Sequence, residues 1–144
     1  MKHFPKRIAL LVLLSLSRLV HASPPANVRV IVNQSVRDGG ISAAALKNIY
    51  TGRTNYWDGG ERVVIAVLTD GTDQALDEVS GMEASEFRTF WQRLVFSGRG
   101  EEPRTANDAA SLMALVASTR GAIALVPADV PLKGVKALDV RWGR

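Results

Sequence analysis

The chain has 144 residues, carries 18 Lys and Arg against 14 Asp and Glu, and contains no cysteine. Both of its histidines, His3 and His21, lie within residues 1–22. The remainder therefore lacks a thiol, the usual general base near neutral pH and the commonest metal ligand, which excludes triad hydrolases, cysteine peptidases, zinc sites and haem sites. We expect no cofactor and no enzymatic activity, because the acid–base groups left are paired carboxylates and nothing in the sequence indicates the pocket that would raise the pKa of one of them.

Residues 1–22 predict a cleaved secretory signal peptide. Basic residues precede the apolar run 8–16, and Ala22 stands just before the predicted cleavage position. As a helix the run spans about 13 Å, against about 30 Å for the hydrocarbon core of a bilayer, so an uncleaved membrane anchor is the weaker alternative. We therefore predict a periplasmic protein with no membrane span after signal cleavage.

Loss of the signal peptide also removes the positive charge of the chain. None of the 14 acids lies in residues 1–22, whereas four of the 18 cations do, namely Lys2, Lys6, Arg7 and Arg18. The rest is formally neutral, so we expect no nucleic-acid partner, because that binding needs a surplus of positive charge. Residues 23–144 are predicted to form one domain, since their length supports a single hydrophobic core.

A strand, a loop and a helix are predicted in the first part of this domain. Residues 28–32 (VRVIV) are β-branched and indicate a strand, and a loop follows at 33–40. Ser42 is a candidate N-cap for the next helix, and Gly52 is well placed to end it. The apolar face of this helix consists of Leu46, Ile49 and Tyr50.

The middle of the chain predicts a buried strand and two helices. The continuous apolar run 63–68 is typical of a strand buried on both faces, as in a parallel sheet. A polar loop at 69–73 leads into a short helix. The clearest helix spans 85–96, where one apolar stripe is formed by Phe87, Phe90, Trp91, Leu94 and Val95.

The last part of the chain continues the alternation of helices and strands. After a loop at 97–106, Asn107 is the expected cap of a helix that Gly121 closes. Residues 122–126 indicate a second buried strand, and 135–140 a last, half-exposed one. Strands that alternate with helices indicate an open α/β sheet with parallel pairs, mostly parallel or mixed and flanked by helices.

Five short motifs occur in order along the domain. They are a strand ending in Asn33, the helix and turn at 41–52, the YWDG turn at 56–59, the helix and loop at 90–103 with FW and FSGRG, and GAIALV at 121–126. Together they resemble the small periplasmic proteins related to the phosphate-binding component of ABC importers. The resemblance implies an α/β lobe of the periplasmic-binding-protein type and a non-enzymatic, substrate-binding role with a phosphate-like small anion as ligand.

The resemblance also implies a partner. Two-lobed members of the family hold their ligand between the lobes, and this chain has room for about one lobe. An envelope protein or a second copy of the chain would then complete the cleft. The alternative is an interaction module that has lost its ligand and docks onto an envelope or secretion complex.

The loop after the second predicted strand is the leading candidate for a ligand site. By resemblance to the phosphate-binding loop of the family, its ligand-binding residues are Asp70, Gly71 and Thr72, and Leu68 stands where the family has an arginine. Thr69 joins this candidate set because its hydroxyl is a further donor. A loop between a buried strand and a helix directs free N–H groups and the positive helix end to one place. The alternative is an ordinary turn with Thr72 or Asp73 as the N-cap.

Other residues extend this candidate site. Asn33 and Ser35 follow the first strand and are predicted to face the same crevice, unless they only form a polar strand exit. Trp57 and Trp91 are aromatic candidates for ligand stacking, although packing in the core is the stronger interpretation for both. The candidate counter-charges for an anion are Arg37, Arg53, Arg88, Arg99 and Arg120.

Overall fold

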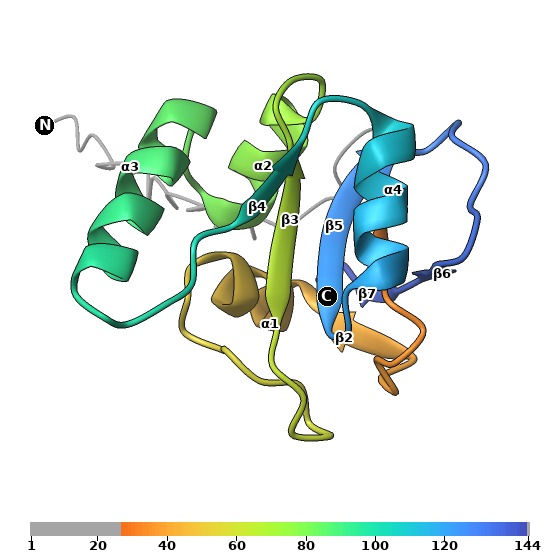
Figure 1. Ribbon diagram of the computed structural model, residues 1–144, viewed down its shortest axis with the longest axis horizontal. Coiled ribbons are helices and arrows are strands. Elements are labelled where there is room, and N and C mark those ends of the chain that lie inside the picture. The colour runs from red at the N-terminus through yellow and green to blue at the C-terminus, as the bar shows by residue number, and fades with distance from the viewer. Residues whose placement is uncertain (1–26, 144) are drawn as a thin grey trace, which may run out of the picture.

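The apolar strands of the sequence form the centre of a five-stranded sheet (Figure 1). The computed structural model describes residues 27–143, so the predicted signal peptide at 1–22 lies outside the described residues. The strand order is β4-β3-β5-β1-β6. These strands are β1 (Val28–Val32), β3 (Val64–Leu68), β4 (Arg104–Ala106), β5 (Ala122–Pro127) and β6 (Lys136–Ala137).

The sheet is mixed, with a parallel and an antiparallel half. β3 runs parallel to both β4 and β5, and Val64 lies opposite Ala122. β1 runs antiparallel to β5 and to β6. The predicted open α/β sheet with parallel pairs is therefore confirmed. Because β1 runs opposite to β3, the carboxyl ends of these two strands lie at opposite edges of the sheet.

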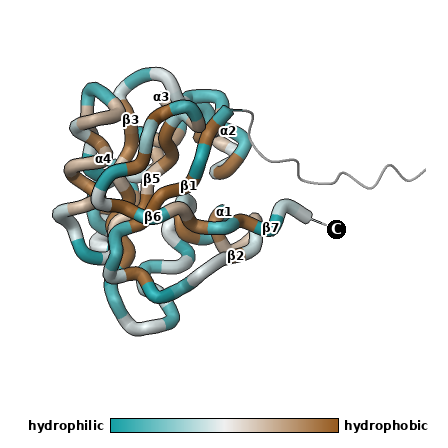
Figure 2. Tube along the Cα trace, turned by 90° about the vertical axis from the view of Figure 1, so that its right-hand side faces the viewer, coloured by the Kyte–Doolittle hydropathy of each residue, from teal (hydrophilic) through white to brown (hydrophobic). Residues whose placement is uncertain are grey.

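Helices cover both faces of this sheet. One face carries α1 (Ala43–Tyr50), α2 (Asp73–Ser80) and α3 (Ala84–Phe96), and the other carries α4 (Ala109–Ser118). β5 is buried on both faces because its side chains alternate between the two cores: Ile123 packs with the first group, and Ala124 with α4. Figure 2 shows apolar segments in the strands and also in the helices that pack against them. Within residues 27–143, no helix is long and apolar enough to cross a bilayer.

The helix ends follow from their capping residues. The N–H of Ala45 donates to Ser42 Oγ at 3.0 Å, which confirms the predicted cap of α1, and Gly52 has a left-handed φ of 68° just beyond its end. The predicted cap of α4, Asn107, is wrong. Asp108 holds that position, and its carboxylate accepts from the N–H of Ser111 at 2.7 Å.

Two short strands form a separate parallel pair, β2 (Gly40–Ser42) with β7 (Asp139–Arg141). The prediction of one strand at 135–140 is therefore wrong: β6 ends at Ala137, and β7 leaves the main sheet to pair with β2. Leu138 between them is buried, and its N–H donates to the carbonyl of Val30 at 2.9 Å. β4 falls in a segment predicted as a loop, and β2 spans the end of a predicted loop and the predicted start of α1.

Candidate functional site

The loop from Thr69 to Asp73 lies at the carboxyl ends of the parallel strands β3 and β4. The N–H of Thr69 donates to the carbonyl of Ala106 at 2.9 Å and ties the two strand ends together. Gly71 turns the loop with a φ of 98°. Thr72 is buried and holds the N-cap position of α2, but its side chain makes no capping hydrogen bond. The predicted loop thus joins a strand to a helix as expected.

A cavity of about 140 Å³ lies beside this loop, between β3, α2, α3 and the segment that enters β4. Leu76, Phe87 and Trp91 contribute apolar walls. The charged side chains that line it are those of Asp73, Arg88 and Glu102, all of which belong to exposed residues. The cavity therefore combines apolar walls with charged groups in contact with solvent.

The structure brings only part of the predicted ligand set to this cavity. Thr69 lines it together with Asp73 at the start of α2. Asp70 and Gly71 are exposed and stand outside its lining, and Thr72 is buried but does not line it either. The Thr69 hydroxyl is already bonded, since it lies 3.2 Å from the carbonyl oxygen of Ala106 and 3.1 Å from Asn107 Oδ1.

One of the five candidate arginines lines the cavity. Arg88 reaches it from α3. Arg120 instead forms an ion pair with Glu61 at 2.9 Å, and Arg99 donates to the Ser97 hydroxyl at 3.3 Å. Arg88 is therefore the candidate arginine that shares a cavity with Thr69 of the predicted loop, a choice that the sequence pattern could not make.

Asn33 and Ser35 lie at the other edge of the sheet. The side-chain amide of Asn33 is buried and donates to the carbonyls of Val116 and Ala117 at 2.7 and 2.9 Å, at the end of α4. Ser35 Oγ accepts from the N–H of Gly121 at 3.0 Å. The prediction that both face the crevice of the 69–72 loop is wrong, because β1 runs antiparallel to β3.

The tryptophans named from the sequence are packing residues. Trp57 is buried, and its indole N–H donates to the carbonyl of Gly121 at 2.9 Å. The indole N–H of Trp91 donates to the carbonyl of Tyr50 at 3.1 Å. A Cβ atom at Gly100 would lie 2.9 Å from the Trp91 ring, so this glycine permits close packing. The motifs behind the family resemblance thus describe how the lobe packs.

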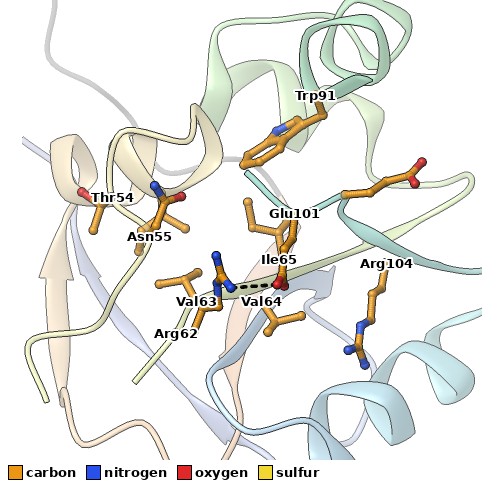
Figure 3. A pocket seen from close by; sticks show the side chains of 11 residues that line it. Thr54, Asn55, Arg62, Val63, Val64, Ile65, Trp91, Glu101 and Arg104 are labelled. Atoms are coloured by element: carbon orange, nitrogen blue, oxygen red, sulfur yellow. Dashed lines mark hydrogen bonds and ion pairs between the residues drawn. The ribbon is translucent and has the colours of Figure 1, made fainter. Parts of the chain in front are cut away.

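A second, polar cavity of about 30 Å³ lies near the start of β3 (Figure 3). The ion pair between Arg62 and Glu101 spans part of it at 2.8 Å, and both side chains are about half exposed. Trp91 and Glu102 line both cavities. Its volume holds about one water molecule, which is too little for a ligand. Among the described residues, no cluster of His, Cys, Asp and Glu could hold a metal ion.

Among known proteins, solved structures share the fold of this chain. No family model matches the chain, and no curated protein matches it. Solved structures do match. One is a candidate phosphate ABC transporter substrate-binding protein from Clostridium perfringens with bound phosphate, at a TM-score of 0.62 and 19% identity over 79% of this chain and 44% of that one.

Two further structures show the same likeness. An ABC-type phosphate transport receptor from Vibrio cholerae has a TM-score of 0.53 and 17% identity over 79% of this chain and 46% of its own. A phosphate-binding protein from Stenotrophomonas maltophilia has a TM-score of 0.60 and 16% identity over 80% of this chain and 39% of its own. The chain spans less than half the length of these structures. It has the fold of one lobe of a phosphate ABC transporter substrate-binding protein.

Proposed function

We propose that the chain is an exported, non-enzymatic binding domain that captures a small anionic group at the carboxyl edge of β3. One observation carries the proposal: Arg88, Thr69 and Asp73 line a single cavity at the end of a parallel strand pair. Ligands of open α/β sheets bind beyond the carboxyl ends of such strands. The likeness to phosphate-binding lobes supports the same class of ligand.

The proposed binding chemistry relies on Arg88. Its guanidinium offers charge-assisted hydrogen bonds, which are about twice as strong as neutral ones. The N–H groups at the start of α2, where Asp73 lines the cavity, add neutral donors. Asp73 and Glu102, which line the same cavity, oppose a dianion, so the site favours a ligand of low negative charge.

Inorganic phosphate itself is expected to bind weakly. Leu68, at the position of the family's arginine, is only 8% exposed and packs in the core around α4. Loss of one charged hydrogen bond weakens binding by roughly 10- to 150-fold. We expect a dissociation constant in the millimolar range, or no binding, measured by titration calorimetry on the monomer.

The contribution of Arg88 is tested by its substitution. Arg88→Gln should abolish residual phosphate binding, whereas Arg93→Gln on the same helix should not, because Arg93 does not line the cavity. Micromolar binding that survives in Arg88→Gln would place the anion site elsewhere in the molecule and refute this assignment.

Export and periplasmic location form part of the same proposal. The predicted signal peptide supports them, since its apolar run is too short to remain as an anchor. N-terminal sequencing of the secreted protein should begin at Ser23. A secreted species that retains Met1 would contradict cleavage.

A second candidate function is docking onto an envelope protein or onto a second copy that completes the cleft. The observation that favours it is Phe96 at the end of α3, which is 97% exposed. Among the described residues, the exposed large hydrophobic side chains are Tyr56 and Phe96, and Phe96 is the more exposed of the two. If a second copy is the partner, sedimentation should detect a dimer that Phe96→Ser dissociates. A monomer at all concentrations would leave an envelope protein as the partner in this alternative.

A further inference from the structure

We infer that the cavity beside Thr69 takes an α-amino acid with a small apolar side chain. The inference rests on the proposed function, because it uses the same cavity and the same cation, and it names the class of ligand. The anionic group captured at Arg88 would then be the carboxylate of that amino acid. The argument depends on the size of the cavity, its walls and the charges around it.

The size and walls of the cavity fit a compact apolar group. An apolar cavity of about 150 Å³ holds a benzene molecule, and this cavity measures about 140 Å³. Leu76, Phe87 and Trp91 are each less than a tenth exposed and form an apolar part of its wall. Inorganic phosphate has no apolar surface to place against this wall, whereas a side chain of four to six carbons does.

The charged side chains that line the cavity favour a ligand that carries both a positive and a negative charge. Arg88 supplies one positive charge, and Asp73 and Glu102 supply two negative ones. In the described part of the chain none of the three forms an ion pair, since the ion pairs there join Arg62 to Glu101 and Arg120 to Glu61. A simple anion would meet two carboxylates and a simple cation would meet Arg88. A zwitterion pairs its carboxylate with Arg88 and its ammonium with the acids.

The test compares L-leucine with its three truncated forms on the purified exported protein. 4-Methylpentanoate lacks the ammonium group, 3-methylbutylamine lacks the carboxylate, and glycine lacks the side chain. Calorimetry should rank leucine first, with each truncated form weaker by roughly 10-fold or more, as expected for the loss of a charged hydrogen bond or of a buried apolar group. Inorganic phosphate serves as the fifth ligand.

Variants assign each part of the ligand to the cavity. Arg88→Gln and Asp73→Asn should each weaken leucine binding by roughly 10- to 150-fold, while Arg93→Gln leaves it unchanged. Ala84→Phe, which introduces a ring at a residue lining the cavity, should reduce the affinity for leucine to that for glycine. Melting curves of all variants verify that they are folded.

The outcomes separate this inference from the proposed function. If 4-methylpentanoate or phosphate binds as tightly as leucine and Arg88→Gln abolishes that binding, the anion site stands and the amino-acid inference is overturned. If leucine binding is unaffected by both Arg88→Gln and Ala84→Phe, the cavity is not its site and the inference is also overturned. If none of the five ligands binds, both proposals fail.

Discussion

Tyr50 places a hydroxyl group in the core without a partner. The residue is 0% exposed, and its ring packs near Phe87 at a centroid distance of 6.3 Å. Its side-chain hydroxyl oxygen makes no hydrogen bond within the described residues. Burial raises the pKa of this hydroxyl above its ordinary value, since the charged form would lose its hydration. An unpaired buried polar group costs about 1–3 kcal/mol.

Tyr50→Phe is therefore expected to raise the free energy of unfolding by about 1–3 kcal/mol at pH 7. The difference in free energy of unfolding between the variant and the wild type should increase above pH 10. At that pH Tyr50 ionises in the unfolded chain but stays protonated in the folded one, so the wild type loses stability and the variant does not. Denaturant unfolding at pH 7 and at pH 10.5 measures both effects. A lower stability of Tyr50→Phe at pH 7 would mean that the hydroxyl has a hydrogen-bond partner.

Gly121 joins three parts of the lobe through its backbone. Its φ is 73°, its carbonyl accepts from the indole of Trp57 and from the N–H of Val64, and a Cβ atom would collide with the carbonyl of Arg62. A left-handed conformation alone costs a non-glycine residue about 1–2 kcal/mol. The collision adds to that cost, since backbone atoms have to move.

Gly121→Ala is expected to lower the free energy of unfolding by more than about 2 kcal/mol. Gly60→Ala is the matched control, because Gly60 also has a positive φ, of 84°, but has open space around it. Thermal melts of the two variants isolate the steric contribution. Equal losses of stability in the two variants would show that the backbone around Arg62 can move away from the added methyl group without an energetic penalty.

Single residues of the candidate site could be predicted only in part. The sequence indicated the loop at 69–73 because turn residues there separate an apolar run from a helix. It could not choose Arg88 among five arginines, because the choice depends on how α3 lies against β3. Asn33 was misplaced for a related reason: a local pattern of apolar residues shows a strand, but not its direction relative to a distant one.

At the scale of elements, α4 depends on a carboxylate at its start. Asp108 Oδ1 accepts from the N–H of Ser111, and this hydrogen bond is the main reason why the pKa of Asp108 lies below its ordinary value. A lowered pKa in the folded state means that the stabilising effect is complete above pH about 4 and is lost as the pH falls through the folded-state pKa.

Asp108→Asn is expected to keep the cap, since asparagine caps helices about as well as aspartate, and to remove its pH dependence. Urea unfolding between pH 2 and 7 should show a smaller loss of stability in the variant than in the wild type at the acid end. Parallel curves for the two proteins would show that Asp108 does not hold α4 in solution.

Elements with strong local patterns were predicted well. The apolar run of β3, the stripe of α3 and the β-branched β1 each combine periodicity with clear boundaries. β2 and β4 have three residues each, which is too short for a periodicity to appear. The division of 135–140 into β6 and β7 depends on a partner at residues 40–42, about a hundred residues earlier in the chain.

At the scale of the molecule, two cores share one sheet. β5 contributes Ile123 to the core under α1, α2 and α3 and Ala124 to the core under α4. Loss of either core would expose one face of the same strand, so the two cannot melt independently. We expect a single unfolding transition with the same midpoint by far-ultraviolet circular dichroism and by tryptophan fluorescence. Two separate midpoints would show that α4 or the α1–α3 layer unfolds alone.

The pairing of β1 with β5 has a consequence for how the chain folds. Val28 lies opposite Pro127, so the first strand of the lobe finds its main partner near the other end of the sequence. Closing so long a loop costs conformational entropy before the strands form stabilising contacts. Contacts between residues this far apart in the sequence therefore slow folding. During synthesis, β1 cannot complete its pairing with β5 until residue 127 has emerged. The nascent chain therefore stays open until late, and folding is completed only when almost all of it is available.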